Sequence, residues 1–143
     1  MRLWHYKLLP YLPKSQLLAQ WRELNSIFKD QPRHILINYI YTYPKEDLLI
    51  YSDMVYSEML RRGYRVRIGA GTPFTDYFGI VCPFLEMRPP FPKHHNFAYL
   101  RQCYYNLEEK FMRGQKDFDG EAFDSLCDFY INELRKFEEA RKL

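Results

Sequence analysis

The sequence predicts a mainly α-helical fold: a single compact domain, residues 1–143, of about four helices with a long irregular connection. Two observations predict it. In four separate stretches, apolar residues recur at steps of three and four, which places them on one face of a helix. The chain is also 47% hydrophobic over 143 residues, which suits one domain with its own core rather than a disordered chain.

The stretch of residues 13–28 contains the first predicted helix, which carries the residue on which the functional hypothesis depends. Its apolar face consists of five residues: Leu17, Leu18, Trp21, Leu24 and Phe28. Pro13 precedes the helix, and Ser15 is its expected N-cap. Glu23 stands beside the apolar face, where a core helix would hold a carboxylate toward a cleft. A solvated glutamate on a surface helix is the simpler interpretation of the same pattern.

The segments on either side of this helix have no clear periodicity. Prolines break any continuing helix, so residues 1–12 are expected to form an extended N-terminal arm. Residues 34–43 are apolar and β-branched, which predicts either a strand or a short buried helix, because periodicity does not separate the two. His34 opens this segment next to Arg33 and is expected to cap or hydrogen-bond its neighbours.

The second predicted helix covers residues 47–62, and Gly63 follows as its C-cap. Its buried face repeats at steps of three and four: Leu48, Tyr51, Val55 and Met59. Four arginines gather around its end: Arg61, Arg62, Arg65 and Arg67. The helix dipole favours cations at this position, and the same cluster also suits contacts with DNA phosphates.

Residues 68–95 contain five of the nine prolines and no periodic pattern, which predicts a long irregular connection. Lys93, His94 and His95 are expected to be exposed at its end. Two adjacent histidines without an evident third ligand are weak evidence for a metal site.

The last third of the chain predicts two more helices. One covers residues 97–111, with Asn96 as its N-cap and Gly114 at its end. The other has Asp119 as its N-cap and an apolar face over residues 123–137. Together with the two earlier helices, they make up the predicted helical domain.

Charge and cysteine content limit the kinds of partner and site that the protein is expected to have. The formal net charge is +3, and residues 1–67 carry 11 Lys and Arg against 6 Asp and Glu, so the first half is the candidate surface for a polyanion. Cys82, Cys103 and Cys127 lack the spacing of a metal or redox site and are interpreted as reduced and buried in a cytoplasmic protein. We expect no membrane partner, because neither a signal peptide nor a long apolar run is present.

Three stretches resemble the pyrimidine dimer DNA glycosylase family, of which phage endonuclease V is a member. The opening Met-Arg-Leu-Trp-His is similar to the start of a bacterial branch of the family. Residues 16–24, Gln-Leu-Leu-Ala-Gln-Trp-Arg-Glu-Leu, and the later Leu-Arg-Arg-Gly-Tyr are also similar. The positions that match the phage enzyme without a gap are Leu17, Ala19, Arg22, Glu23, Leu24, Phe28 and His34. The resemblance covers residues 1–67 and fades afterwards.

The resemblance implies a bifunctional DNA glycosylase and abasic-site lyase that acts on pyrimidine dimers or related base damage without a cofactor. In the family, the N-terminal amine attacks C1′ of the damaged nucleotide, forms a Schiff base and cuts the strand by β-elimination. An α-amine has a pKa of about 7.7–8.0, which is lower than the pKa of a lysine side chain. It is therefore partly neutral and nucleophilic at physiological pH. This amine maps onto Met1, or onto Arg2 if the methionine is removed, and the assisting carboxylate maps onto Glu23.

The resemblance and the basic first half together imply double-stranded DNA with a damaged base as the partner of a monomeric protein. The expected DNA-binding residues are Arg22, Arg33, His34, Lys14, Arg61, Arg62 and Arg65. Family enzymes kink the duplex and flip a nucleotide, which suits a basic surface rich in aromatic residues.

Three departures from the family pattern leave other functions open. Arg2 replaces the small residue that the phage enzyme exposes, Ser26 replaces an arginine that helps to hold DNA, and the aromatic tail of the phage enzyme has no clear match. The main alternative is a non-catalytic helical domain of the same fold that binds DNA or another protein. A third hypothesis is a metal-dependent hydrolase that uses His94 and His95.

Overall fold

The computed structural model describes residues 1–79 and 86–143, and every regular element within these residues is helical. In chain order, with η for a 3-10 helix, the elements are η1 (Tyr6–Tyr11), α1 (Lys14–Asp30), η2 (Asn38–Thr42), α2 (Lys45–Arg61), α3 (Pro73–Phe78), α4 (Phe97–Met112) and α5 (Gly120–Arg141). The predicted mainly α-helical fold is confirmed. Within the described ranges, no helix is both long and apolar enough to cross a bilayer.

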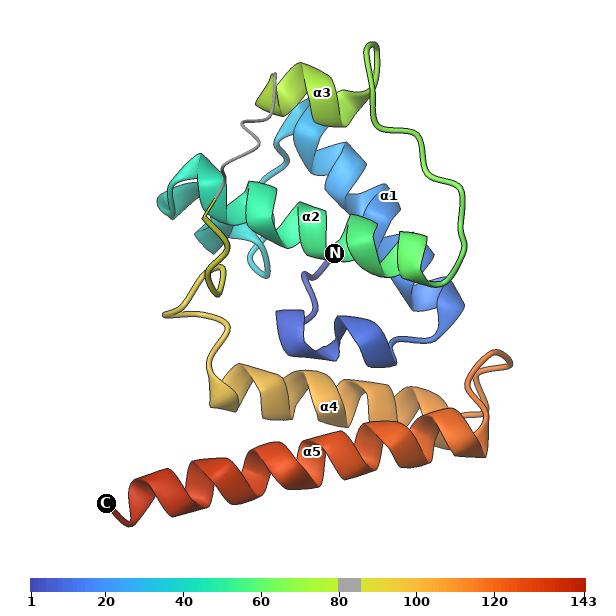
Figure 1. Cartoon of the computed structure of the whole chain (residues 1–143), viewed down its shortest axis with the longest axis vertical. Helices are drawn as coiled ribbons and strands as arrows, with labels where there is room; N and C mark the ends of the chain where they lie inside the picture. Colours follow the sequence, from blue (N-terminus) through green and yellow to red (C-terminus); the bar gives the residue numbers. More distant parts are fainter. Residues whose placement is uncertain (80–85) are drawn as a thin grey trace.

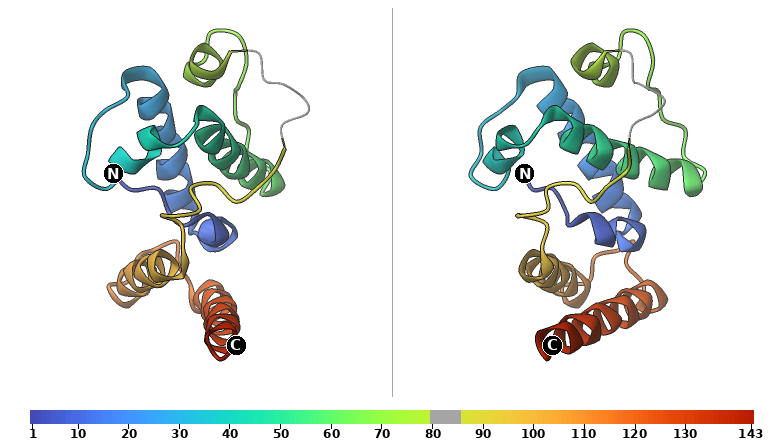
Figure 2. Two further views of the ribbon diagram at one scale, coloured as in Figure 1. Left: turned by 90° about the vertical axis from the view of Figure 1, so that its left-hand side faces the viewer. Right: turned by 60° about the vertical axis from the view of Figure 1, so that its left-hand side comes forward.

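The helices form two groups with η1 between them (Figure 1). Helix α1 packs against α2 and α3, while α4 and α5 form an antiparallel pair (Figure 1). The η1 helix contacts α2 as well as α4 and α5, so the N-terminal segment joins the two groups. Turned views show the same arrangement, with the C-terminus at the far end of α5 (Figure 2).

The N-terminal segment is extended only as far as His5, and the prediction of an extended arm over residues 1–12 is wrong beyond that point. The chain turns into η1 because the His5 side chain accepts a hydrogen bond from the N–H of Lys7, and because Leu8 and Leu9 enter the core. A 3-10 helix of six residues is too short to show a hydrophobic period, so the sequence pattern did not reveal it.

Helix α1 begins at Lys14, and the prediction of Ser15 as its N-cap is wrong. Pro13 occupies the cap position and makes no side-chain hydrogen bond there. Instead, the N–H of Ser15 in the first turn donates to Oδ2 of Asp117 at 2.7 Å. A free backbone N–H at the start of α1 therefore finds its hydrogen-bond acceptor in the loop between α4 and α5, 102 residues away in sequence. No local pattern reveals this contact.

Both segments without a clear period contain a short helix. The alternative left open for residues 34–43 is decided in favour of a helix, because η2 occupies part of this stretch with its Ile40 side chain buried. The connection over residues 68–95 is less irregular than predicted. It contains α3, which is capped by the Thr72 side chain and packs against α1.

Helices α2, α4 and α5 confirm the three other predicted helices. Asn96 and Asp119 cap α4 and α5 with their side chains, as expected. Gly63 follows α2 with a φ of +85°, a left-handed conformation that glycine adopts without steric cost. Helix α5 continues to Arg141, past the last apolar position of its predicted face at Phe137.

Single residues depart from the predictions in two places. His95 was predicted to be exposed but is only 4% accessible, because it packs among aromatic rings that include Phe91. Of the cysteines, Cys103 is buried as expected and Cys127 is only partly buried, while Cys82 lies outside the described residues.

Candidate active site

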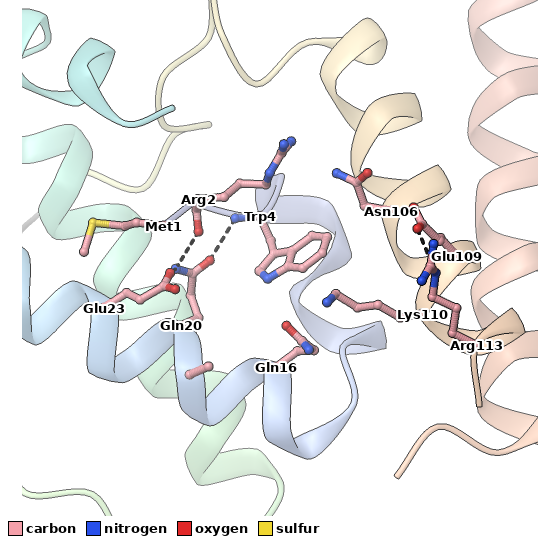
Figure 3. A pocket seen from close by; sticks show the side chains of 11 residues that line it. Met1, Arg2, Trp4, Gln16, Gln20, Glu23, Asn106, Glu109, Lys110 and Arg113 are labelled. Carbon is pink, nitrogen blue, oxygen red and sulfur yellow. Dashed lines mark hydrogen bonds and ion pairs between the residues drawn. The ribbon is translucent and has the colours of Figure 1, made fainter. Parts of the chain in front are cut away.

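A cleft of about 550 Å³ separates the N-terminal segment and α1 from α4 (Figure 3). The first wall includes Met1, Arg2, Trp4, Gln20 and Glu23. All three predicted catalytic residues therefore line one cleft, although η1 separates Glu23 on α1 from the other two in sequence. This cleft is the candidate active site.

Gln20 holds the N-terminal segment against α1. The residue is 1% accessible, and its Oε1 accepts the N–H of Trp4 at 2.8 Å. Its Nε2 donates to the carbonyl of Arg2 at 3.1 Å and to Oε2 of Glu23 at 3.3 Å. One buried side-chain amide therefore fixes the backbone on both sides of Leu3 and orients the carboxylate of Glu23.

Two tyrosines hold the same segment from other helices. The hydroxyl of Tyr51, which is fully buried on α2, donates to the carbonyl of Trp4 at 2.6 Å and lies 3.0 Å from Oε1 of Gln20. The hydroxyl of Tyr99 on α4 donates to the carbonyl of Leu3. Burial raises the pKa of both hydroxyls, so they remain protonated donors. Side chains from three helices thus pre-organise the backbone that leads into the cleft.

His5 ties this segment to the loop before α4. Its Nδ1 accepts the N–H of Lys7 at 3.1 Å, so the proton of the neutral ring lies on Nε2, which donates to the carbonyl of His95 at 2.9 Å. The hydroxyl of Tyr39 meets Nε2 of His95 at 2.7 Å. Burial lowers the pKa of His5 to about 4 and that of His95 to about 3. Both rings are neutral at physiological pH, so their role in the fold is structural.

Glu23 is half-buried at the edge of α1, where the apolar pattern predicted it. Figure 3 shows its side chain on the cleft side of α1, close to the backbone of Met1 and Arg2. The side chain of Arg2 points away from Glu23, toward the side of the cleft formed by α4 (Figure 3). A carboxylate in this position can stabilise positive charge that develops near residue 1, or accept a proton there.

Helix α4 forms the opposite wall, and none of its residues was among the predicted site residues. It contributes Asn106, Glu109, Lys110 and Arg113, and Lys110 points into the cleft toward α1 (Figure 3). Arg113 pairs with Glu109 at 2.9 Å. Positions 106, 110 and 113 recur at steps of four and three, so the same helical period that predicted α4 also indicates that these polar residues share a face.

Three of the predicted DNA-binding residues lie on α1 and on the turn that follows it, outside the lining of the cleft. Arg22 is exposed on α1. Arg33 is exposed, with its guanidinium 4.4 Å from the centre of the Tyr41 ring. His34 closes a turn with its own side chain, because its Nδ1 accepts the N–H of Leu36 at 3.1 Å. The hydrogen bonding expected for His34 is therefore observed, while contact of these three residues with DNA stays a prediction.

The remaining predicted cations lie away from the cleft, at the end of α2 and the start of α1. Arg61 and Arg62 both pair with Glu58, and Arg62 also donates to two backbone carbonyls of η1. Lys14 lies over an aromatic ring, and Arg65 is exposed. The structure does not bring these residues together with Glu23, and their contact with DNA stays a prediction.

The predicted histidine pair does not form a metal cluster within the described residues. His94 meets the hydroxyl of Tyr43 through Nδ1 at 2.7 Å, and His95 meets Tyr39. Among residues 1–79 and 86–143, no three His, Cys, Asp or Glu side chains come together as ligands. The two histidines therefore serve as hydrogen-bond partners of tyrosines in this part of the chain.

Comparison with known proteins assigns the first wall of the cleft to a known family. The family model described as pyrimidine dimer DNA glycosylase matches residues 1–70. This range contains the N-terminal segment, α1 and α2, and it ends before α4 and α5. No curated protein and no solved structure gives a significant match to the chain.

Proposed function

The chain belongs, through residues 1–70, to the pyrimidine dimer DNA glycosylase family, and from this premise we propose that it is a DNA repair glycosylase with abasic-site lyase activity. Its substrate is double-stranded DNA with a pyrimidine dimer or related base damage. The N-terminal amine is the nucleophile, and Glu23 assists it. The observation that carries the proposal is that Met1 and Glu23 line one cleft, in which Gln20 contacts both Glu23 and the carbonyl of Arg2.

The reaction begins when the neutral amine attacks C1′ of the damaged nucleotide. The N–C1′ bond forms as the glycosidic bond breaks, and the base leaves with the bonding electrons and takes up a proton. The attached nitrogen then loses a proton, and the sugar ring opens with protonation of O4′, which gives a Schiff base. Removal of a 2′ proton expels the 3′ phosphate by β-elimination, and water finally releases the amine.

Glu23 has two tasks in this scheme. Its negative charge stabilises the positive charge that develops on the sugar as the base departs. Its oxygens carry protons to O4′ and away from the 2′ carbon. Both tasks need a carboxylate in a fixed position, and the hydrogen bond from Nε2 of Gln20 at 3.3 Å supports that requirement.

We assign the nucleophilic amine to Met1, with Arg2 as the alternative if the methionine is removed. A bulky second residue normally preserves the methionine, and Arg2 is such a residue. The carbonyl of Arg2 is held by Gln20 at 3.1 Å. The amine of Met1 therefore lies one residue beyond an anchored backbone position, on a short and adjustable arm inside the cleft.

The cations of the cleft support DNA as the substrate. Lys110 points into the cleft from α4, and the side chain of Arg2 extends from the opposite wall toward the α4 side of the cleft (Figure 3). Arg113 follows Lys110 by three residues on the same helix. Cations on facing walls suit a sugar-phosphate backbone that runs between α1 and α4 with the damaged nucleotide beside Glu23.

Borohydride trapping tests the proposal. The full chain is mixed with duplex DNA that carries an abasic site or a cyclobutane pyrimidine dimer, with reductant present, and the adduct is mapped by peptide analysis. We expect a covalent adduct on the N-terminal peptide. A variant with several extra residues before Met1 should give no such adduct, because its terminal amine lies outside the cleft, whereas Lys142→Gln should trap like the parent chain.

Two results would contradict the proposal in different ways. An adduct on an internal lysine would keep the chemistry but reject the terminal amine. Absence of any adduct, together with salt-sensitive binding to duplex DNA, would favour the non-catalytic DNA-binding domain of the same fold.

A further inference from the structure

The indole of Trp4 lies in the candidate active site with an unpaired hydrogen-bond donor. Trp4 is 7% accessible and lines the cleft. Both hydrogen bonds that it makes to side chains within residues 1–79 and 86–143 use its backbone, with Gln20 at 2.8 Å and Tyr51 at 2.6 Å. Its Nε1–H therefore has no partner in this part of the chain, whereas a buried indole N–H ordinarily finds an acceptor.

This N–H opens to the cleft and is not enclosed in the core. Among the residues that the structure describes, Nδ1 of His95 is the one fully buried side-chain nitrogen or oxygen without a hydrogen-bond partner. Because Nε1 of Trp4 also lacks a partner, it is not fully buried, and it is reached from the cavity that Trp4 lines. The cleft therefore contains a neutral donor whose backbone is held on both sides.

The groups that share this part of the cleft carry positive charge. Figure 3 shows Lys110 extending from α4 toward the side of the cleft where the Trp4 indole lies. The neighbouring carboxylate of Glu109 is paired with Arg113 at 2.9 Å, and Lys110 forms no ion pair within the described ranges. The side chain of Arg2 also points toward α4 (Figure 3). This side of the cleft therefore presents hydrogen-bond donors and cations.

A phosphate group of the DNA backbone is the ligand that fits these groups. An indole N–H only donates, and a lysine ammonium offers three donors and one positive charge. A phosphate supplies acceptor oxygens to both, and a hydrogen bond to an ionised acceptor is stronger than one between neutral groups. The carbonyl of a base accepts the indole N–H equally well in geometry but leaves the charge of Lys110 without a counter-charge.

We propose that the indole N–H of Trp4 donates to an oxygen of one DNA phosphate, whose charge Lys110 neutralises. The inference rests on the proposed function, because it takes the ligand of the cleft to be DNA. Gln20 holds the backbone of Trp4 and also contacts Glu23. The phosphate contact therefore fixes the DNA strand against the same side chain that orients the carboxylate, which makes Trp4 a substrate-positioning residue.

An isosteric replacement of the indole tests this contact. Trp4 is replaced by benzothienylalanine, in which sulfur takes the place of the N–H group and the volume of the rings is kept. The duplex carries a tetrahydrofuran abasic analogue, which the amine does not attack, so that binding is measured without reaction. The matched control has the same replacement at Trp21, the other tryptophan of the chain, which packs against three aromatic rings.

We expect the Trp4 replacement to weaken duplex binding about tenfold, as the loss of a hydrogen bond to a charged acceptor does. The slope of log affinity against log salt concentration should stay parental, because a neutral donor releases no counterion. The Trp21 control should bind like the parent chain. Equal affinity for the parent and the Trp4 replacement would overturn the contact.

A methylphosphonate scan identifies the acceptor. Single phosphates around the abasic analogue are replaced by neutral methylphosphonates, with one duplex for each position. At one position we expect the Trp4 replacement and Lys110→Gln each to cause little further loss of affinity, because the phosphate that both side chains contact has already lost its charge. If the Trp4 replacement lowers the affinity by the same factor at every position, a phosphate is not the acceptor and the proposal is overturned.

Borohydride trapping by the parent chain on a natural abasic duplex separates failure of this contact from failure of the proposed function. An adduct on the N-terminal peptide without coupling in the scan would reject the phosphate contact and leave the proposed function standing. Coupling in the scan without any adduct would support the contact and reject the lyase activity. Absence of duplex binding by the parent chain would reject both.

Discussion

The side-chain carbonyl of Gln20 accepts the backbone N–H of Trp4 at 2.8 Å, and this contact joins the N-terminal segment to the helix that carries Glu23. Gln20→Met keeps the volume and removes the hydrogen bonds to Trp4, Arg2 and Glu23. We expect the free energy of unfolding to fall by about 1–3 kcal/mol, because the N–H of Trp4 is left buried without its partner. Denaturant unfolding measures this loss.

Under conditions in which the Gln20→Met variant is folded, it should form the borohydride-trapped adduct with abasic DNA far more slowly than the parent. The reason is that the terminal amine is no longer held beside the carboxylate. Gln102→Met, on the exposed face of α4, serves as the control and should leave both stability and trapping unchanged. Trapping at the parental rate by folded Gln20→Met would show that the anchor is not needed for the reaction.

Glu23→Gln should abolish most strand cleavage while leaving duplex affinity close to that of the parent. The amide keeps the shape but neither stabilises the developing positive charge nor carries a proton, so we expect a loss of about 10²-fold or more in the single-turnover rate. Glu46→Gln, an exposed glutamate at the start of α2, is the control. Parental cleavage by Glu23→Gln would remove Glu23 from the mechanism.

Lys110→Gln should weaken binding to undamaged and damaged duplexes alike. If the ammonium group contacts one phosphate, the slope of log affinity against log salt concentration should fall by about one. Fluorescence anisotropy over a salt series measures it. Lys142→Gln, beyond the end of α5, should leave the slope unchanged. An unaltered slope in Lys110→Gln would place the DNA backbone outside this wall of the cleft.

Acid should destabilise the protein through its two buried histidines. Their pKa is lowered by burial from 6.5 to about 4 for His5 and to about 3 for His95. The stability that depends on neutral rings is complete above pH 6.5 and is lost as the pH falls toward these lowered values, because the unfolded chain binds protons that the folded chain does not. For His5 the loss is roughly 3 kcal/mol.

Unfolding by denaturant between pH 7 and pH 4 measures this dependence. The His5→Asn variant keeps a side-chain acceptor for the N–H of Lys7 but does not titrate, so its stability should fall less steeply over the same interval. Identical pH profiles for the parent and the variant would show that His5 does not contribute.

Asp117→Ala should destabilise the start of α1 although it lies far from that helix in sequence. It removes the acceptor that holds the N–H of Ser15 at 2.7 Å, and loss of a helix cap costs about 1 kcal/mol. Asp124→Ala, an exposed aspartate on α5, is the control for lost negative charge. Equal unfolding free energies for the two variants would show that the contact does not act as a cap.

Much of the helical framework follows from sequence because its determinants are local. Helices α2, α4 and α5 combine a periodic apolar face with a capping residue or a terminal glycine nearby, and Gly63, Asn96 and Asp119 act as predicted. The short helices η1, η2 and α3 lack enough length for a period, so their conformation depends on packing against longer helices.

The candidate site likewise has one wall that could be predicted from the sequence and one wall that could not. Glu23 was identifiable from its position beside the apolar face of α1, and the resemblance to the glycosylase family implied a catalytic role for residue 1 or 2. The opposite wall was not identified, because Lys110 belongs to a helix outside the resemblance and its direction depends on how α4 packs.

The sequence by itself therefore determined the four long helices, α1, α2, α4 and α5, and which carboxylate is held at the edge of the core. Only the tertiary structure decided that Gln20 joins Arg2 and Glu23, that Asp117 caps α1 and that His95 is buried. The physical reason is that hydrogen bonds and burial between distant segments depend on the relative placement of helices. The pattern of apolar and capping residues within one segment does not specify where the other segments lie relative to it.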